Sequence, residues 1–382
     1  MSIKHIAKEY VKMGVQNVYL PVLYKSAAKA PVDKNRVIFA DAHSHSTPYS
    51  MKRLEQACRE AGFLVETHYS DYQKDGATAT VKSMQDFMRS YATAGAVVIS
   101  DTFLPAASCD KRSETKLVQL WHGAGALKKF GYATTDDVPS YYKGNIYKNY
   151  DLITVSGKKA VEPFATSMQA AAGVTRAIGV SRTDNYFDTE YISAMRQRVY
   201  EAYPEAADKK VVLYAPTFRG TADEAGEDET ERIAGMLRSE LSDEWYLISS
   251  AHPHARGKGA AVGSGDTSDH RSAFCSEELM LIADVLITDY SSIIFDYLFL
   301  KRPVILYAPD YEEFGRLRGF YTPYEELPGR IVTDPKRLSE AIESECRDFD
   351  ETRITDYLSR YLECCDGRAT ERIVEYLKNG AN

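Results

Sequence analysis

The stretch ADVLITDYSSIIFDYLFLKRPVILY, residues 283–307, contains the two patterns from which the fold is predicted. Residues 284–288 form a short apolar run that is typical of a buried strand, and from residue 293 onward apolar side chains recur at helical spacing. Ser291 and Ser292 lie between them. A strand that turns into a helix at two serines presents backbone N–H groups, hydroxyls and a positive dipole end, all of which favour phosphate. Ser291 could equally be an ordinary helix cap, and this pattern alone leaves both interpretations open.

Similar apolar runs recur along the chain, separated by segments of helical periodicity such as 51–61 and 81–88. The further strand candidates are 18–23, 37–40, 63–67, 96–100, 117–121, 151–155, 176–180, 211–214, 245–249 and 304–307. Strands that alternate with helices predict βαβ units and parallel sheets, with ligands bound outside the carboxyl ends of the strands. The predicted fold class is therefore α/β.

The strand series is interrupted at residues 184–191, so we place a domain boundary at residue 187. A chain of 382 residues is also long for a single hydrophobic core. We expect an N-terminal α/β domain over 1–187 and a C-terminal α/β domain over 188–382. The last helix, predicted over 369–378, is amphipathic and could pack back on the first domain.

The composition, with 44% hydrophobic and 27% charged residues, describes a globular protein. The net charge of -8 argues against a general nucleic-acid binder, so an anionic substrate would need a locally basic pocket. The six cysteines form no C-x-x-C pair and no zinc spacing, which favours reduced, cytosolic thiols. No apolar signal core follows Met1, and no run reaches the roughly 20 apolar residues that a membrane span needs.

The segment WHGAGALKKFG, residues 121–131, follows a strand candidate and carries His122. Gly123 and Gly125 have no side chains, so the backbone at these positions could approach a ligand closely. Two lysines follow. An imidazole at a strand end, beside glycines and cations, can act as a general base near a phosphate. The alternative is a histidine that only anchors its loop.

Three more strand ends carry residues suited to a phosphate. Arg182 lies in GVSRTD, and Arg219 closes LYAPTFR after Thr217. Guanidinium groups bind phosphate through paired hydrogen bonds. His252 is a second candidate imidazole, on a backbone that Pro253 constrains. A lone arginine is usually a surface residue, but two at strand ends of one parallel fold favour an anion site.

The segment DAHSH, residues 41–45, supports a different interpretation. An Asp-x-His-x-His pattern at a first strand end resembles the opening motif of metal-dependent amidohydrolases, in which Asp41, His43 and His45 could reach one cation. Such enzymes need further ligands at later strand ends of a barrel of about eight strands. The alternative is a polar loop that leads into a helix near Tyr49 and could face the acceptor of a transfer reaction.

Laid end to end, these stretches resemble the CDP-glycerol glycerophosphotransferase family of teichoic-acid and capsule synthesis. The residues that carry the resemblance are WHGAGALKKFG (121–131), GVSRTD (179–184), LYAPTFR (213–219), AHP (251–253), ADVLITDYSSIIFDYLFLKRPVILY (283–307), FGRLRGFY (314–321) and PGRIV (328–332). The joint occurrence of W-H-G, P-T-F-R and T-D-Y-S-S-x-x-F-D in this order is highly specific. The resemblance covers the chain from residue 115 onward and is looser before that.

The resemblance implies two Rossmann-like domains that face a cleft, the arrangement called GT-B, with the acceptor at the first domain and the CDP-linked donor on the second. It implies transfer of glycerol phosphate from CDP-glycerol to a hydroxyl of a lipid-linked saccharide or polyol-phosphate acceptor, with release of CMP and without a metal or other cofactor. By motif position, His122 is the expected base, and His252 the ligand that stabilises the leaving CMP. The expected substrate-binding residues are Gly123, Ala124, Gly125, Ala126, Arg182, Pro216, Thr217, Arg219, Ala251, Pro253, Ser291, Ser292 and Asp296.

The resemblance also implies a cytoplasmic enzyme bound peripherally to the inner face of the cell membrane. Residues 1–29 carry five lysines among apolar side chains, which could contact anionic lipid, although lysine-rich surface helices are common. Two sites depart from the family pattern: Ala124 and Gly125 stand where Thr-Pro is common, and Ser250 stands where a basic residue is frequent. These departures leave CDP-ribitol or a nucleotide sugar as alternative donors. A nucleotide-binding protein without catalysis and the metal hydrolase remain as further alternatives.

Overall fold

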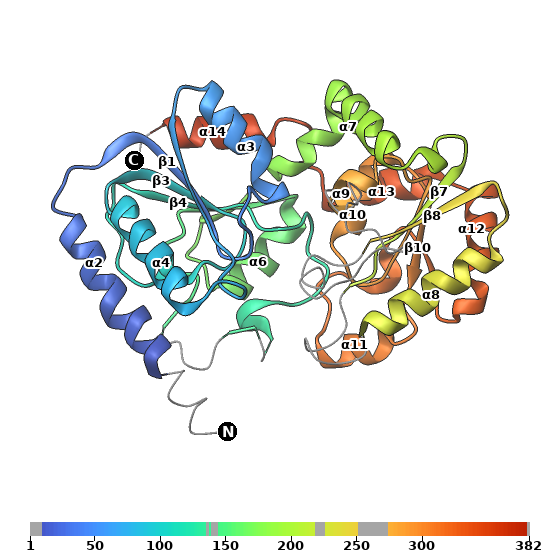
Figure 1. The fold of residues 1–382 in the computed structure, drawn as a ribbon, viewed down its shortest axis with the longest axis horizontal. Coiled ribbons are helices and arrows are strands. Elements are labelled where there is room, and N and C mark those ends of the chain that lie inside the picture. The colour runs from blue at the N-terminus through green and yellow to red at the C-terminus, as the bar shows by residue number, and fades with distance from the viewer. Residues whose placement is uncertain (1–9, 135–136, 139–143, 218–225, 251–273, 380–382) are drawn as a thin grey trace. The chain divides into compact units, whose positions relative to one another are not determined.

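The computed structural model describes residues 10–134, 137–138, 144–217, 226–250 and 274–379 (Figure 1). The chain divides into two compact units, and each unit has its own parallel sheet. The first unit comprises Met1–Ala124, Lys129–Asn185 and Tyr361–Asn382, and the second comprises Gly125–Lys128 and Tyr186–Arg360. The α/β class with two parallel sheets is thus as the sequence predicts.

The sheet of the first unit has six parallel strands in the order β2-β1-β3-β4-β5-β6. They are β1 (Asp33–Asp41), β2 (Leu64–Tyr69), β3 (Ala94–Ile99), β4 (Lys116–Gln119), β5 (Leu152–Val155) and β6 (Thr175–Ala177). Strands β3, β4 and β5 consist of buried residues, as expected for parallel strands covered by helices on both faces. Because β1 pairs with β2 on one side and β3 on the other, the strand order reverses between β1 and β3.

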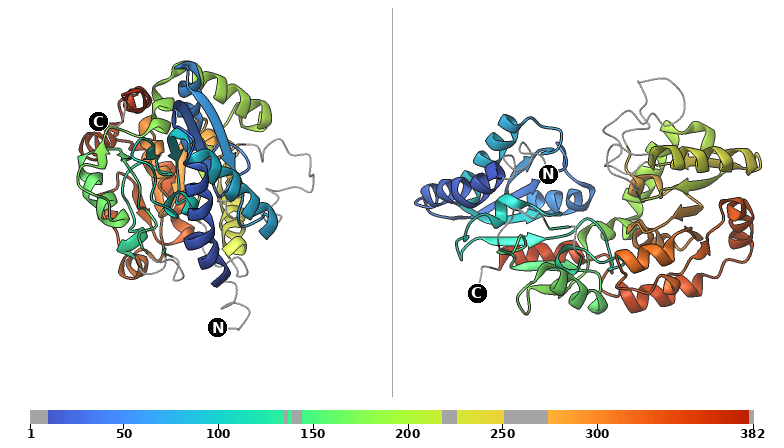
Figure 2. Two further views of the ribbon diagram at one scale, coloured as in Figure 1. Left: turned by 90° about the vertical axis from the view of Figure 1, so that its left-hand side faces the viewer. Right: turned by 90° about the horizontal axis from the view of Figure 1, so that it is seen from below.

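Helices cover both faces of this sheet. Right-handed crossovers place α3 (Tyr49–Glu60) and α4 (Ala77–Tyr91) on opposite faces. Helix α2 (Leu20–Ala27) lies alongside α4, and the last helix, α14 (Ala369–Lys378), lies alongside α3 (Figures 1 and 2). The shorter helices of the unit are α5 (Leu104–Ala107) and α6 (Val161–Met168).

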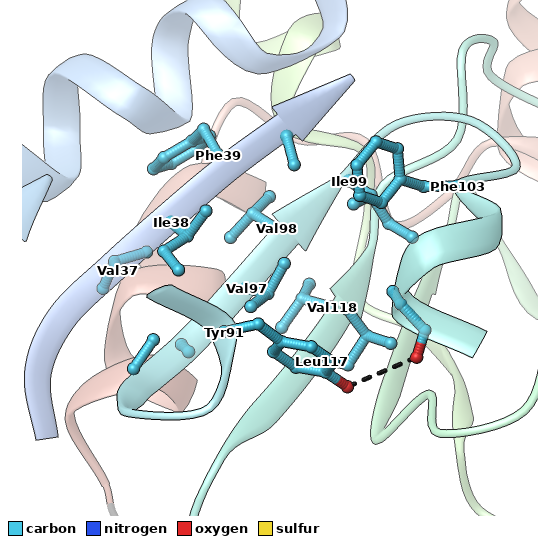
Figure 3. Close-up of a cluster of buried hydrophobic side chains, with 14 of the residues drawn as sticks. Val37, Ile38, Phe39, Tyr91, Val97, Val98, Ile99, Phe103, Leu117 and Val118 are labelled. Carbon is cyan, nitrogen blue, oxygen red and sulfur yellow. Dashed lines mark hydrogen bonds between the residues drawn. The ribbon is translucent and has the colours of Figure 1, made fainter. Parts of the chain in front are cut away.

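The core of the first unit lies between these helices and the central strands. Figure 3 shows the apolar side chains of β1, β3 and β4 together with Tyr91 of α4 and with Phe103. The Tyr91 hydroxyl donates to the Ala106 carbonyl oxygen at 3.5 Å, and Phe103 meets the Phe87 ring edge-on with centroids 4.7 Å apart. Burial of Phe103 fixes the chain immediately after the loop that follows β3, and that loop carries Asp101.

Residues 18–23 are helical, so the strand predicted there is wrong. They belong to one helical run, in which a π-helical turn (Val15–Tyr19) continues directly into α2. The local run of valine, tyrosine and leucine resembles a strand, but Gln16, Leu20 and Tyr24 are buried at a spacing of four residues. The Tyr24 ring lies 5.1 Å from that of Tyr91, centroid to centroid. Packing of one helical face against α4 therefore overrides the local strand propensity.

The sheet of the second unit has five parallel strands in the order β11-β10-β9-β7-β8. They are β7 (Lys210–Tyr214), β8 (Trp245–Ser249), β9 (Val285–Thr288), β10 (Val304–Tyr307) and β11 (Arg330–Val332). The helices of the unit are α7 (Thr189–Ala202), α8 (Gly226–Glu240), α9 (Ser276–Leu279), α10 (Ile293–Tyr297), α11 (Tyr311–Leu317), α12 (Leu338–Arg347) and α13 (Glu351–Tyr361). Leu237 of α8 and Leu338 of α12 pack in one core with the central strands. Here the strand order reverses between β7 and β9.

The six cysteines are all free thiols in the structure. Burial raises the pKa of the Cys58 and Cys109 thiols to about 12. Thiols with such a pKa are poor nucleophiles at neutral pH, so these two side chains serve as core packing.

Candidate functional site

His122 follows β4 at the carboxyl end of the first sheet. Its side chain is 51% exposed, and its Nδ1 lies 3.2 Å from the Oδ2 of Asp101. Asp101 itself follows β3, next to the point where the strand order reverses. Ligands of open α/β sheets bind at such a reversal, outside the carboxyl ends of the strands. An imidazole with one nitrogen at a carboxylate can use the other nitrogen as a general base.

The Asp101 carboxylate lies between two imidazoles. The His43 Nε2, from the loop after β1, is 4.0 Å from the same Oδ2 that His122 approaches. Burial would raise the pKa of Asp101, but the two imidazoles and the Thr102 amide, which donates to Oδ1 at 2.6 Å, hold it well below its usual range. Asp101 is therefore ionised at neutral pH and can accept a hydrogen bond from His122.

Arg182, an expected phosphate ligand, is only 2% exposed. Its Nη1 donates to the His122 carbonyl oxygen at 2.6 Å and to the Ser50 hydroxyl at 3.1 Å. The guanidinium also lies over the Tyr49 ring, 5.4 Å from the centroid. The structure thus brings Arg182 together with His122, through the main chain of His122.

The motif GVSRTD, which contains Arg182, also binds the last helix. The Asp184 carboxylate accepts the amide hydrogens of Ala369 and Thr370, at 3.1 and 2.7 Å, in the first turn of α14. A side chain at Gly179 would collide with the Cys364 carbonyl oxygen, and Gly179 has φ +86°. These residues attach α14 to the first unit and so have a structural role.

The residues of the DAHSH motif have separate partners. The Asp41 carboxylate accepts the His43 amide at 2.7 Å, the His43 ring faces Asp101, and the His45 Nε2 lies 3.2 Å from Asp75. Burial raises the pKa of Asp41. Within the described part of the chain, no three histidine, cysteine or carboxylate side chains form a group that could hold a metal ion.

The loop after His122 passes from one unit to the other. Gly123 and Ala124 are buried in the first unit, Gly125–Lys128 belong to the second, and the chain returns to the first at Lys129. Gly125 has φ +73°, and a Cβ there would lie 2.7 Å from the Phe295 ring. Proline requires a φ near -65°, so the proline of the Thr-Pro pattern that is common in the glycerophosphotransferase family cannot adopt the backbone conformation of Gly125. The Ala126 carbonyl oxygen accepts the Thr322 hydroxyl at 2.9 Å.

In the second unit, two loops meet at the carboxyl ends of β7 and β9, where the strand order reverses. Asp289, 2% exposed, connects them: its Oδ1 accepts the Thr217 amide at 2.7 Å and the Tyr290 amide at 2.6 Å. Pro216, Thr217, Ser291 and Ser292 are half-buried around this connection. The Thr217 hydroxyl has no hydrogen-bond partner among the residues described.

The helix after the serines is shorter than the sequence indicates. Helix α10 has 5 residues and is followed by a 3-10 turn, Leu298–Leu300. Ser292 occupies the N-cap position without a side-chain cap bond, and the Ser291 Oγ accepts the Ile293 amide at 3.4 Å. Neither serine is a strong cap.

Other predicted site residues are buried or lie outside the described residues. Asp296 is fully buried, and its carboxylate accepts the Tyr186 hydroxyl at 3.2 Å. Ser250, which stands where the family frequently has a basic residue, is buried, with its Oγ 2.7 Å from that of Ser276. The predicted residues outside the described part of the chain are Arg219, Ala251, His252 and Pro253.

Comparison with known families decides the identity of the chain. The family model described as CDP-glycerol:poly(glycerophosphate) glycerophosphotransferase matches residues 22–379. The chain belongs to this glycerophosphotransferase family. It is therefore a member of a transferase family of teichoic-acid and cell-wall synthesis that uses CDP-linked alcohols.

Several members of the glycerophosphotransferase family are similar over most of the chain. The teichoic acid ribitol-phosphate primase of Bacillus spizizenii is 36% identical over 295 residues, 75% of this chain and 76% of that protein. The teichoic acid glycerol-phosphate primase of Bacillus subtilis is 29% identical over 292 residues, 74% of this chain and 73% of that protein. The solved structure of the wall teichoic acid polymerase TagF covers 99% of this chain and 98% of its own, with a TM-score of 0.74 at 20% identity, and thus shares the fold.

From the sequence alone, no role in the transfer reaction is assigned to two carboxylates that follow strands, one in each unit. Asp101 follows the strand predicted over 96–100, and Asp289 follows the strand predicted over 284–288. A carboxylate directly after a buried strand can indicate a ligand site at the end of a parallel sheet. Whether it lies at such a site depends on the strand order, because ligands bind where this order reverses. The strands on either side of each reversal are not consecutive in sequence, so the sequence alone does not reveal it.

Proposed function

We propose that this protein transfers a polyol phosphate from a CDP-linked polyol to a hydroxyl of a lipid-linked teichoic-acid acceptor and releases CMP. The observation that carries the proposal is the half-exposed His122 imidazole, held through Nδ1 by Asp101 at the carboxyl end of a parallel sheet. A general base of this kind suits attack by a hydroxyl group.

The proposed step is a direct displacement at the β-phosphorus, the one that carries the polyol. The acceptor oxygen forms a bond to this phosphorus while the bond from the phosphorus to the bridging oxygen breaks. CMP leaves with the bridging oxygen, and His122 takes the proton of the acceptor hydroxyl. Negative charge builds on the leaving CMP, where fixed donors stabilise it best.

The donor is proposed to bind at the carboxyl ends of β7 and β9. The Thr217 hydroxyl, which has no hydrogen-bond partner among the described residues, and the half-buried Ser291 and Ser292 support this, because hydroxyl groups can donate hydrogen bonds to a diphosphate. His252 and Arg219 are proposed to supply positive charge to the leaving group.

The two units are proposed to face a common cleft, as in the GT-B arrangement. The strand order of each sheet supports this, because each has one reversal with candidate residues at its carboxyl ends. The loop that carries His122 also continues directly into the second unit at Gly125. Acceptor and donor would then meet between His122 and Thr217.

We propose ribitol phosphate as the transferred group, in place of the glycerol phosphate that the motifs imply. The ribitol-phosphate primase is 36% identical to this chain, and the glycerol-phosphate primase 29%. Glycerol phosphate is the second candidate, because it stands in the description of the family model.

An assay of CMP release tests the proposed function. CDP-ribitol, CDP-glycerol and a nucleotide sugar are each offered with a synthetic lipid-linked disaccharide, bare or carrying one polyol phosphate, and the product is measured by mass spectrometry. We expect kcat/KM to be at least about tenfold higher for CDP-ribitol than for CDP-glycerol, since a site built for hydroxyls rejects a donor that lacks them. Turnover of the nucleotide sugar alone would refute the proposal, and a preference for CDP-glycerol would refute the choice of polyol.

We propose that the amino-terminal helical run binds the inner face of the cell membrane. Val11, Val18 and Val22 are 67%, 64% and 62% exposed and share the helix face opposite the buried Leu20 and Tyr24. Lysines lie on the same run, so that it offers apolar area and positive charge to anionic lipid. No helix within the described residues has the length and apolar character needed to cross a bilayer.

The double variant Val18→Glu/Val22→Glu is expected to bind anionic vesicles at least about tenfold more weakly, because apolar area is lost and negative charge is added. The measurement is co-sedimentation with phosphatidylglycerol-containing vesicles. Leu317→Glu is the matched control, since Leu317 is 73% exposed on α11 of the other unit. Equal losses of vesicle binding in both variants, or no loss in Val18→Glu/Val22→Glu, would contradict the proposed membrane contact.

A further inference from the structure

The residues around His122 fix its ring and its main chain from several directions. The Oδ2 of Asp101 lies 3.2 Å from Nδ1, within hydrogen-bond distance for a charge-assisted pair. His43, at 4.0 Å, is outside that distance and acts on the carboxylate only electrostatically. His122 is thus the imidazole that this carboxylate can orient.

We propose that Asp101 is the positioning residue of the transfer reaction. It holds His122 in the tautomer that carries the proton on Nδ1, so that the lone pair on Nε2 accepts the proton of the acceptor hydroxyl. This inference rests on the proposed function, and it adds a residue that the motifs do not mark. A carboxylate that fixes the tautomer of a general base contributes to the rate without touching substrate.

Gln119 supports this dyad from the end of β4. Its side chain is fully buried, its Nε2 donates to the Asp101 carbonyl oxygen at 3.1 Å, and its Oε1 accepts the Trp121 amide at 2.8 Å. Nε2 also donates to the Tyr150 hydroxyl at 3.2 Å. These three bonds agree on one orientation of the amide. One side chain therefore connects the loop that carries Asp101 to the residue before His122.

Trp121 adopts a backbone conformation that is costly for a large side chain. Its φ of 64° lies in the left-handed region, which costs such a residue on the order of 1 kcal/mol. Its ring stacks on His122 with centroids 4.4 Å apart and contacts Phe130 at 4.6 Å. The Gln119 bond and the ring stacking maintain this conformation, which turns the His122 ring toward Asp101. Strain of this kind is characteristic of functional sites.

The His122 main chain is held from its other side by Arg182, as described above. Its ring is held by Asp101, and its preceding residue by Gln119. A histidine that served only as packing would not need a buried guanidinium, a buried amide and an ionised carboxylate around an exposed ring. The arrangement is that of an imidazole kept in one orientation for chemistry.

The first test is the kinetics of Asp101→Asn. We expect kcat to fall about 10²–10³-fold with little change in the KM for the CDP-polyol, because the amide favours the wrong tautomer and does not touch the donor. Asp101→Glu restores part of the rate, since it returns the carboxylate. The matched control is Asp110→Asn: this aspartate is fully exposed in the same unit, paired with Lys148 at 3.2 Å, and is expected to leave kcat unchanged.

The second test measures the tautomer itself in the full-length protein labelled with ¹⁵N-histidine. NMR correlation of the ring nitrogens is expected to show His122 protonated at Nδ1 in the wild type and at Nε2 in Asp101→Asn, with thermal unfolding confirming that both are folded. Wild-type kcat in Asp101→Asn, or an Nε2-protonated His122 in the wild type, would overturn the inference. If no CDP-polyol yields CMP with the wild type, the proposed function fails, and the NMR result still decides whether Asp101 orients His122.

Discussion

Replacement of His122 by alanine is expected to lower CMP release by about 10³-fold or more while binding of cytidine nucleotide survives. The variant loses the only group to which we assign proton transfer from the acceptor, and general bases contribute about 10²–10⁴-fold to rates. The residues proposed to bind the donor lie in the other unit, around Thr217 and Ser291. The measurements are kcat from CMP release and the Kd for CDP from titration calorimetry.

His45→Ala is the matched control for this variant. His45 is also a histidine of the first unit, 63% exposed and paired with Asp75. The transferase account expects near-normal turnover after its removal, whereas a metal hydrolase built on Asp41, His43 and His45 would lose its activity. Normal turnover in His122→Ala would refute its assignment as the base, and loss of nucleotide binding would make His122 a donor ligand.

Replacement of Asp289 by alanine is expected to destabilise the second unit and to weaken donor binding together. The buried carboxylate accepts two backbone amides, from Thr217 and Tyr290, and its loss leaves both without this acceptor. Hydrogen bonds to charged groups contribute about 1.5–3 kcal/mol each, so we expect a loss of about 3 kcal/mol or more. Because these amides set the loop that carries Thr217, the Kd for CDP should rise at least about tenfold.

Asp289→Asn separates these effects from a general loss of folding. The asparagine keeps an oxygen acceptor at Oδ1 and is expected to retain most of the stability and of the CDP affinity. Asp348→Ala, at a position 69% exposed, controls for removal of a carboxylate from the same unit. Chemical denaturation and calorimetry measure the two quantities. An Asp289→Ala variant with wild-type stability and CDP affinity would contradict the role we assign to this carboxylate.

The strands could be predicted because parallel strands are buried on both faces and appear as short apolar runs. The prediction for β10 at 304–307 agrees with the structure in both bounds, and that for 211–214 lies within β7. Strand β11 was not predicted from the sequence, because its three residues, Arg330–Val332, are too few to show a periodic pattern. Helix α8 was not predicted, because it begins within an acidic, polar stretch and the described residues that it buries, Ile233, Ala234 and Leu237, come later in the helix.

Residues of the candidate site could be predicted only where they lie in the motifs. His122, Thr217, Ser291 and Ser292 follow apolar runs directly, and the structure places them at strand ends. Asp101 could not be assigned, because its neighbour His122 comes from a different strand and the pairing of β3 with β4 is a property of the folded sheet. Nor could the sequence indicate that Arg182 is buried against the His122 main chain.

Our central proposal is that one CDP-polyol contacts both His122 of the first unit and Thr217, Ser291 and Ser292 of the second. A crystal structure of His122→Ala with the bound donor tests it most directly, through the distance from the Cβ at position 122 to the β-phosphorus. Our account predicts about 8 Å or less, the reach of an imidazole and one hydrogen bond to the attacking hydroxyl, with the diphosphate bound by the second unit. A distance beyond about 12 Å, or a diphosphate without contact to Thr217, Ser291 or Ser292, would contradict it.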